Sequence, residues 1–290
     1  MRLCSERWAR GLKRIGAMNM EENSKSVLTE SQVAAFNERG YLVADFSLNE
    51  SMLDAIVEKV QPLYPEDYQQ NPTLPARVQD AWKSIDEVRQ LARDMSIAQA
   101  LQQLVGRQSL PFQTLNFPIG TRQFTHSDTV HFNSIPSNYM AGVWVALEDI
   151  DEDNGPLLYY PGSHKLHEYS MHDFDLEPGY HNYHKYEECI QKVIEREQLQ
   201  GEYGVIKKGE ALIWHANLLH GGAPQKDLTR TRHSQVTHYY FADCKYYTPM
   251  NSTADQLNFR EPYWIPDSAD YQLPKPDSLL RRVARKLGIK

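Results

Sequence analysis

The chain has 290 residues, 41% hydrophobic and 24% charged, which is typical of a soluble globular domain with enough apolar material for a core. Its 31 basic and 38 acidic residues give a formal net charge of −7, which argues against a nucleic-acid-binding protein, because such proteins usually carry a basic surface. The cysteines Cys4, Cys189 and Cys244 are far apart, which is typical of a reducing compartment and predicts a cytoplasmic location. No apolar run approaches the ~18 residues that a membrane-spanning helix needs.

Residues 1–27 are predicted to be a disordered leader in front of the folded domain. The first twenty residues contain five basic side chains, but they lack the apolar stretch of a secretory signal. A transit peptide is an alternative, which Glu6 weakens because transit peptides are poor in acidic residues. Another alternative is a true start at Met18 or Met20.

Helical patterns dominate the chain between Thr29 and residue 105. Thr29 and Gln32 have the spacing of a capping box, and Gly40 can end the helix that begins there. A short strand over residues 41–43 follows, and an apolar stripe predicts a second helix over residues 50–63. The pattern is again helical over residues 81–105, with a predicted break near Met95.

After Gly106 the chain changes to short segments rich in β-branched and aromatic residues, separated by glycine and proline, which predict the strands of a sandwich or barrel. One helical insertion is expected over residues 183–198. Helices first and strands later predict an α+β fold, namely a double-stranded β-helix (a cupin-like jelly roll) with flanking N-terminal helices. Residues 28–260 are assigned to this single domain, and residues 261–290 to a C-terminal extension that packs on its surface. The predicted strands cover residues 112–117, 142–147, 157–160, 204–206, 211–214 and 235–241.

His126 and Asp128 belong to an H-x-D triplet, and on a strand their side chains would point to the same face. An imidazole and a carboxylate could then bind one metal ion. A histidine from a facing strand would complete a 2-His-1-carboxylate triad, which leaves positions open for a bidentate co-substrate and oxygen. In a chain with 11 histidines such a triplet is expected by chance. On the triplet alone, an exposed turn or a buried, hydrogen-bonded histidine is therefore the preferred interpretation.

A later segment supplies the groups that the triplet lacks. His220 ends a predicted strand before Gly221 and Gly222, whose missing side chains let the backbone pass close to a metal or ligand. Arg232 and Ser234 then lie on alternate positions at the start of the next strand, and their donors suit a carboxylate. The alternative for Arg232 is an ordinary surface arginine in a basic segment.

With these motifs the chain resembles the phytanoyl-coenzyme A dioxygenase family of iron(II)/2-oxoglutarate oxygenases. The resemblance runs from Leu28 to about Phe241. Its most specific parts are His126-Ser-Asp128, Trp144–Asp149, Asn154–Leu157, Pro161–His164, His220-Gly221 and Arg232-His-Ser234. Several ordered motifs over more than half of the chain make the match specific.

The resemblance implies that His126, Asp128 and His220 bind iron. It also favours hydroxylation over halogenation, because related halogenases replace the carboxylate that Asp128 supplies with a small residue. The resemblance also implies iron(II) as the cofactor, and 2-oxoglutarate and O2 as co-substrates.

The same resemblance implies contacts to 2-oxoglutarate. Arg232, with Ser234, would bind the distal carboxylate, although the long 221–231 loop makes Arg230 a competing candidate. Trp144 would line the co-substrate pocket, and Gln113 on the preceding strand would face it as well.

We therefore expect an iron(II)- and 2-oxoglutarate-dependent dioxygenase that hydroxylates a small organic substrate and releases succinate and carbon dioxide. Two alternatives stay open, a non-catalytic jelly-roll protein that binds a small molecule, and a zinc-dependent hydrolase that uses the same triad. No nucleic-acid partner and no transmembrane segment are expected. A basic C-terminal helix over residues 279–287 could contact a membrane surface, but a solvated helix is the preferred interpretation.

Overall fold

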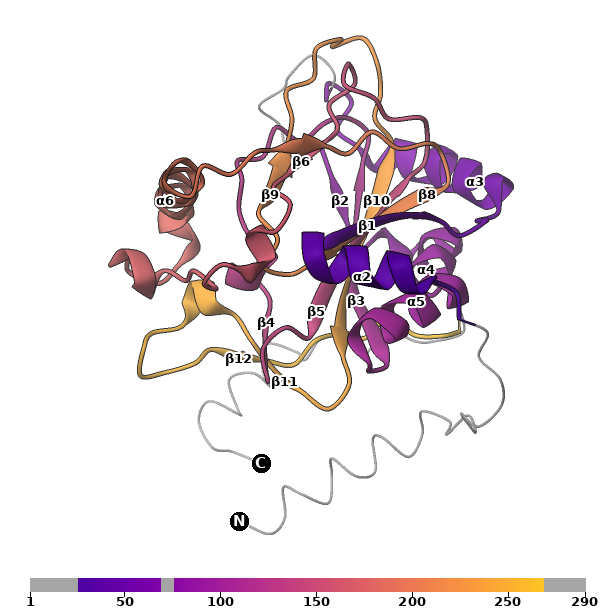
Figure 1. The fold of residues 1–290 in the computed structure, drawn as a ribbon. Coiled ribbons are helices and arrows are strands. Elements are labelled where there is room, and N and C mark those ends of the chain that lie inside the picture. Colours follow the sequence, from indigo (N-terminus) through magenta and orange to yellow (C-terminus); the bar gives the residue numbers. More distant parts are fainter. Residues whose placement is uncertain (1–25, 69–75, 269–290) are drawn as a thin grey trace, which may run out of the picture.

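The computed structural model describes residues 26–68 and 76–268, and its centre is a six-stranded antiparallel sheet (the main sheet) in the order β1-β8-β5-β10-β3-β2 (Figure 1). The predictions for most of the leader and for the 279–287 helix lie outside the described residues. The strands of the main sheet are β1 (Tyr41–Asp45), β2 (Val78–Gln79), β3 (Ser109–Phe117), β5 (Met140–Ala146), β8 (Glu210–His215) and β10 (Ser234–Phe241).

Two three-stranded sheets complete the β-structure, in the orders β7-β6-β9 and β12-β11-β4. Tyr159 of β6 shares an apolar cluster with Trp144 and Leu212 of the main sheet, so the β7-β6-β9 sheet and the main sheet form a sandwich. The strands of the smaller sheets are β4 (Asn133–Ile135), β6 (Leu157–Tyr159), β7 (Glu202–Tyr203), β9 (His220–Gly222), β11 (Lys245–Tyr247) and β12 (Phe259–Arg260).

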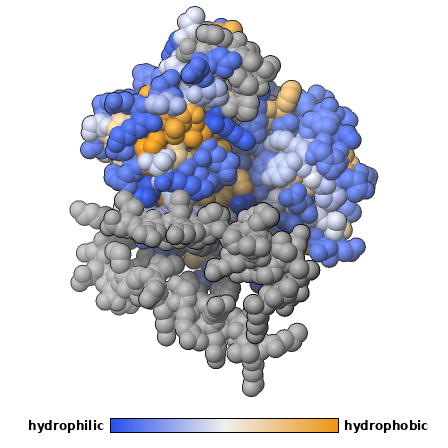
Figure 2. Space-filling view, turned by 180° about the vertical axis from the view of Figure 1, so that it is seen from behind, coloured by the Kyte–Doolittle hydropathy of each residue, from blue (hydrophilic) through white to orange (hydrophobic). Residues whose placement is uncertain are grey.

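Helices cover the other face of the main sheet (Figure 1). Their apolar residues, such as Leu53, Val88 and Leu101, share one core cluster with Val143 of β5 and Ile213 of β8. The polar sides of these helices contribute to a surface that is mostly hydrophilic, as the opposite view of the molecule also shows (Figure 2). The helices are α2 (Glu30–Arg39), α3 (Glu50–Val60), α4 (Asp86–Ala92) and α5 (Met95–Val105).

Alternation along the central strands decides which side chains enter the space between the sheets. Because Val143 and Ile213 pack against the helices, their neighbours Trp144 and Trp214 must point the other way, into the sandwich. On β10 the same rule directs Ser234, Val236 and His238 inward, since Tyr239 packs on the helical side. These inward positions supply much of the wall of the cavity described below.

Most elements expected from the sequence are present. The predicted capping box is confirmed, because the Thr29 hydroxyl accepts from the Gln32 backbone while the Gln32 side chain accepts from Thr29. The helical insertion is confirmed as α6 (Tyr183–Arg196). The expected break near Met95 falls instead at Asp94, whose carboxylate caps α5.

One predicted strand, over residues 204–206, is wrong. The strand β7 ends at Tyr203. The amide of Gly204 still donates to the carbonyl of Leu157, but the amide of Val205 folds back to the carbonyl of Tyr203. Beyond it Ile206 forms only an isolated bridge with Ile150. Glycine thus marks a turn here, not the start of a buried strand.

The last described residues, 261–268, are irregular but attached to the domain. Ile265 is buried, and its amide donates to the carbonyl of Pro111 at 2.9 Å. The guanidinium of Arg89 donates to the carbonyl of Asp267 at 2.6 Å. In the two described stretches no helix has both the length and the apolar composition required to cross a bilayer.

Gly142 gives the fold a testable constraint, because it pairs with Trp214 across the β5–β8 ladder. A Cβ at position 142 would overlap the indole ring of Trp214, which a hydrogen bond to Asp128 holds in place. We expect Gly142→Ala to lower the free energy of unfolding by ~1–3 kcal/mol through overpacking, measured by urea denaturation. Gly162→Ala is the control, since no atom lies within 4 Å of its added Cβ and only its left-handed backbone is strained. An equal or smaller loss for Gly142→Ala would contradict the packing argument.

Candidate metal centre

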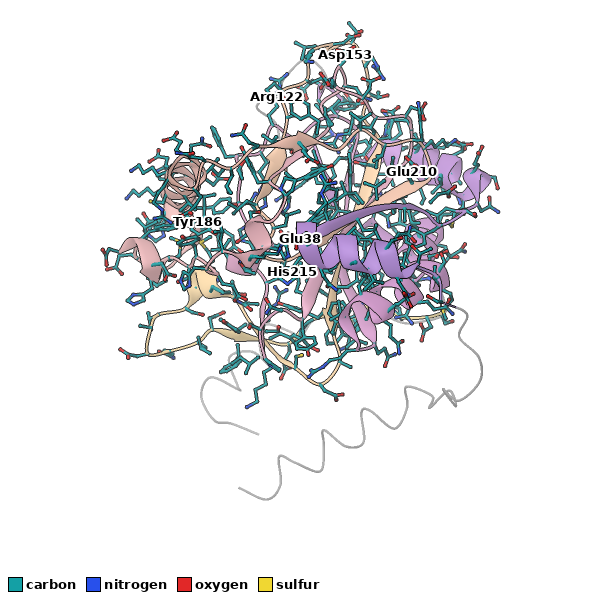
Figure 3. All side chains as sticks on the ribbon, viewed as in Figure 1. Glu38, Arg122, Asp153, Tyr186, Glu210 and His215 are labelled. Carbon is teal, nitrogen blue, oxygen red and sulfur yellow. The ribbon has the colours of Figure 1, made fainter. Side chains whose placement is uncertain are left out.

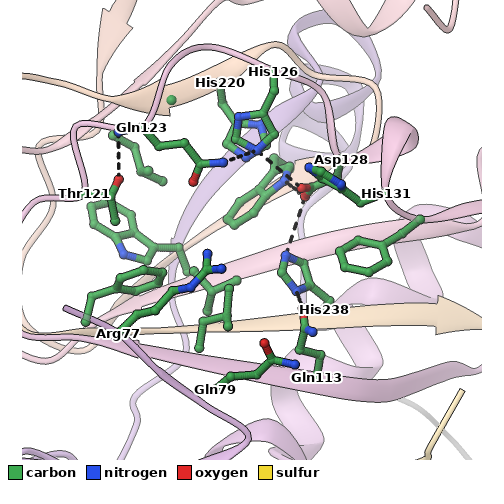
Figure 4. A pocket seen from close by; sticks show the side chains of 18 of the residues that line it. Arg77, Gln79, Gln113, Thr121, Gln123, His126, Asp128, His131, His220 and His238 are labelled. Atoms are coloured by element: carbon green, nitrogen blue, oxygen red, sulfur yellow. Dashed lines mark hydrogen bonds and ion pairs between the residues drawn. The ribbon is translucent and has the colours of Figure 1, made fainter. Parts of the chain in front are cut away.

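A cavity of about 510 Å³ opens between the main sheet and β9, and the three predicted metal ligands line it (Figure 4). One ligand atom from each of His126, Asp128 and His220 can be chosen so that all three atoms lie within 4.8 Å of one another. All three residues are buried, and the centres of the two imidazole rings are 4.7 Å apart. The structure therefore brings together the three residues that the sequence singled out.

The backbone holds the two histidines next to each other. The amide of His126 donates to the carbonyl of His220, and the amide of His220 donates to the carbonyl of His126, both at 2.9 Å. This pairing needs the glycines that follow, because a Cβ at Gly221 or Gly222 would collide with the segment formed by residues 121–125. The glycines thus make room for the backbone that carries His126, not for the metal as the sequence analysis assumed.

The expectation that the H-x-D triplet lies on a strand is wrong. His126 forms an isolated bridge, and Asp128 begins a 3-10 helix, Asp128–Val130. Between them the hydroxyl of Ser127 lies 3.3 Å from that of Tyr186, a fully buried residue of α6 (Figure 3). Ser127 has extended backbone, with φ −111° and ψ 146°, so the side chains on either side of it still point the same way although no strand contains them.

Backbone hydrogen bonds direct one nitrogen of each histidine toward the metal position, where the Nε2 of His126 has only a long contact of 3.4 Å with the side-chain amide nitrogen of Gln123 (Figure 4). The Nδ1 of His126 lies 3.0 Å from the carbonyl oxygen of Phe124, and that of His220 lies 2.9 Å from the carbonyl oxygen of Leu218. A carbonyl can only accept, so both Nδ1 atoms carry the proton and both Nε2 atoms keep a lone pair. The Nε2 of His126 faces Asp128 Oδ1 at 3.8 Å.

Trp214 orients the carboxylate. Its indole Nε1 donates to Asp128 Oδ2 at 2.8 Å, which leaves Oδ1 for the metal. Burial alone would raise the pKa of Asp128, but His220, His238, His126 and this hydrogen bond together lower the pKa to about 2. Burial and the neighbouring His220 lower the pKa of His126 to about 3. A carboxylate and neutral imidazoles are the protonation states that bind a metal.

Arg232 also lines the cavity. Its guanidinium lies 5.3 Å from the ring centre of Trp144 and is almost wholly buried. One nitrogen donates to Ser234 Oγ at 2.7 Å, while Nε, Nη2 and the indole nitrogen of Trp144 have no hydrogen-bond partner among the described residues. Burial lowers the pKa of Arg232 to about 10, so the group is still charged at neutral pH. A buried cation with unused donors fits the distal carboxylate of a bound acid.

The other two co-substrate candidates have other partners. Arg230 is half-exposed and forms a bidentate pair with Asp151, with N–O distances of 2.9 and 2.8 Å, so it does not reach the cavity lining. Gln113 does line the cavity, but its Oε1 lies 3.0 Å from Nδ1 of His238.

Sequence analysis missed several residues of the site. His238, whose Nε2 lies 3.7 Å from Asp128 Oδ2, could have been found, since it stands four residues after Ser234 on one face of the same predicted strand. Trp214 was likewise predicted to lie on a strand. Arg77 and Arg260 also line the cavity, but Arg77 lies between two predicted helices and Arg260 at the end of the predicted domain, where no pattern marks them.

Comparison with known proteins agrees with the motifs. The family model described as phytanoyl-CoA dioxygenase (PhyH) matches residues 16–233. The chain belongs to the phytanoyl-CoA dioxygenase family. It is 28% identical over 141 residues to the peroxisomal phytanoyl-CoA dioxygenase of Rattus norvegicus, and 24% identical over 148 residues to a probable phytanoyl-CoA dioxygenase of Caenorhabditis elegans. These matches cover 47% and 49% of this chain but only 39% and 44% of the relatives, less than half of their length.

Solved structures share the fold. EctD from S. alaskensis, with 2-oxoglutarate and 5-hydroxyectoine, superposes with a TM-score of 0.57 at 18% identity, over 88% of this chain and 89% of that one. The epimerase SnoN from nogalamycin biosynthesis, in complex with Fe3+, alpha ketoglutarate and nogalamycin RO, gives a TM-score of 0.59 at 18% identity, over 81% and 94%. The predicted α+β jelly roll is therefore confirmed for this member of the family.

The hydrogen bond from Trp214 to Asp128 predicts an effect on metal binding. We expect Trp214→Phe to weaken iron(II) affinity by ~10-fold or more, because partners that orient a metal ligand typically contribute that much. Anaerobic competition with a chelating dye measures the affinity. Trp264→Phe is the control, since that ring packs on Tyr246 outside the cavity. An unchanged affinity in Trp214→Phe would show that Asp128 needs no such partner.

Proposed function

We propose that this protein is an iron(II)- and 2-oxoglutarate-dependent dioxygenase that hydroxylates a small organic substrate. The observation that carries the proposal is one cavity that is lined both by a buried 2-His-1-carboxylate triad and by buried Arg232, whose Nε and Nη2 have no hydrogen-bond partner among the described residues. The solved relatives with the same fold include enzymes crystallised with iron and with 2-oxoglutarate.

In this proposal the two Nε2 atoms and Asp128 Oδ1 hold the iron. Two imidazoles and one carboxylate on one side of a metal are the ligand set of non-haem iron(II) oxygenases, and they leave the opposite positions free. When bound, iron and 2-oxoglutarate together activate O2 for oxidation of the substrate, with succinate and carbon dioxide as the other products. The protein supplies orientation and a cavity between its sheets.

The chain's own residues would position the co-substrate. Arg232 and Ser234 would hold its distal carboxylate, and the unpaired indole nitrogen of Trp144 offers one more donor in the same region. Gln113 is better suited to fix the ring of His238 than to bind 2-oxoglutarate, because its amide oxygen already faces that ring. Asp128 favours hydroxylation, since it occupies the position that a halide would need.

The alternatives account for less of the site. A zinc hydrolase would use the triad but would leave a buried, charged Arg232 without a ligand. A protein that only binds small molecules would need neither the fixed tautomers nor the ionised carboxylate. The cytoplasmic location stays a prediction.

Arg232 and Arg230 provide a matched test of the co-substrate site. We expect Arg232→Met to raise the KM for 2-oxoglutarate by ~10–100-fold, because a charge-assisted hydrogen bond contributes about 1.5–3 kcal/mol. Arg230→Met should leave the KM unchanged, since that guanidinium is paired with Asp151 outside the cavity. Succinate formation in the presence of iron(II) and O2 is the measurement. The reverse ranking would assign the carboxylate to Arg230, and the absence of any wild-type turnover with 2-oxoglutarate would refute the proposed function.

A further inference from the structure

The outer part of the cavity contains two more arginines, Arg77 and Arg260, that the proposed chemistry does not use. Among residues 26–68 and 76–268, no carboxylate forms an ion pair with either guanidinium. Arginines outside the cavity do form such ion pairs. Arg39, for example, forms a salt bridge with Glu202. Two cations in one concave site that have no counter-ion in residues 26–68 and 76–268 are suited to an anionic ligand.

Both arginines are held so that they face the cavity. Arg77 directly precedes β2, and its side chain points into the cavity beside those of Gln79 and Gln113 (Figure 4). Arg260, on β12, lies against three aromatic rings, with its guanidinium carbon 4.9 Å from the ring centre of Phe132, 5.3 Å from Phe112 and 5.9 Å from Tyr240. Cation–π contacts of this kind fix a guanidinium in place while its N–H groups stay available at the ring edges.

Arg232 and Arg260 contact different parts of the cavity wall. The guanidinium carbon of Arg232 lies 5.3 Å from the ring centre of Trp144 and 5.7 Å from that of Phe117. The guanidinium carbon of Arg260 lies 4.9 Å from the ring centre of Phe132, which is 5.1 Å from the ring centre of His238. The guanidinium groups of Arg232 and Arg260 can therefore bind different anions.

We propose that Arg77 and Arg260 bind the anionic group of the substrate, which is thus a small organic acid carrying a carboxylate or a phosphate monoester. This inference rests on the proposed function, because it takes the triad as the place where the substrate reacts. The anion would lie near His238, on the side of the cavity away from Arg232. Guanidinium forks match both carboxylate and phosphate oxygens. The cavity of about 510 Å³ must also hold the co-substrate, so the enclosed part of the substrate is small.

A purely structural role for Arg260 fits less well. Arg107 shows such a role, with its guanidinium 3.8 Å from the ring centre of Tyr139 and its nitrogen donating to the carbonyls of Ala242 and Asp243 at 3.2 and 3.1 Å. In the part of the chain described by the structure, the guanidinium of Arg260 makes no comparable bonds to backbone carbonyls. Its guanidinium faces the hydroxyl of Tyr240, and its remaining donors can bind a ligand.

The test is calorimetric titration of the iron(II)- and 2-oxoglutarate-saturated protein without oxygen. The probes are small skeletons, each as a carboxylate, a neutral amide and a phosphate monoester, such as phenylacetate, phenylacetamide and benzyl phosphate. We expect at least one anion of the panel to bind ~10-fold more tightly than its amide, the loss expected for a charge-assisted contact. Whichever of the two anions, carboxylate or phosphate, binds more tightly then identifies the anionic group of the substrate.

The variants locate the site. Arg77→Met and Arg260→Met should each weaken anion binding by at least ~10-fold, while Arg77→Lys should recover part of it because the charge remains. Arg122→Met is the charge-matched control, because Arg122 is exposed at the upper edge of the molecule and is not part of the cavity lining (Figure 3). Amides that bind as tightly as the anions, a panel in which no anion binds, or unchanged binding in both Met variants would overturn the proposal.

Titration of 2-oxoglutarate into the same variants separates this proposal from the proposed function. Arg77→Met should keep the wild-type affinity for 2-oxoglutarate. If this variant lost affinity equally for 2-oxoglutarate and for the anionic probe, Arg77 would belong to the co-substrate site and the proposed substrate site would be overturned. If the wild type bound no 2-oxoglutarate but its anion preference still depended on Arg77 and Arg260, the proposed function would fail and the anion site would stand.

Discussion

The reciprocal backbone hydrogen bonds between His126 and His220 are the constraint on which the candidate centre depends. They join the loop that follows β3 to strand β9 of the β7-β6-β9 sheet, and they place the centres of two imidazole rings 4.7 Å apart. Gly221 and Gly222 permit this close approach because neither carries a Cβ. Carbonyl acceptors then fix the ring tautomers, and Trp214 fixes the carboxylate. The ligand set is thus preorganised by neutral contacts before any metal binds.

The two faces of the main sheet have different roles. One face packs against the helices with small and branched residues such as Val143 and Ile213, which stabilise the fold. The other face carries Trp144, Trp214 and His238 into the cavity. Because strand alternation is strict, the same strands serve the core and the site, and a slip of one residue would exchange them. Besides the triad, three arginines line this cavity, Arg77, Arg232 and Arg260, which would let it accept two organic anions near the metal.

The sequence was sufficient for the elements that have a local signature. The capping box at Thr29, the helical insertion and the metal triad all depend on short motifs, and all were found in the expected places. The 3-10 turn at Asp128 was missed, because the H-x-D spacing suits either a strand or a turn and only the contacts with Trp214 and α6 decide between them. Arg77 and Arg260 could not be predicted, since their roles arise from tertiary packing between segments far apart in the chain.

The most direct test of the central claim is an anaerobic titration of the metal-free protein with iron(II) and 2-oxoglutarate, followed by visible absorption, with Asp128→Ala measured alongside. The account predicts a charge-transfer band of the iron–2-oxoglutarate chelate in the wild type that bleaches when oxygen is admitted, and no such band in Asp128→Ala. A wild type that binds iron(II) but shows no band with 2-oxoglutarate would contradict the account, because it would separate the triad from the co-substrate site built around Arg232.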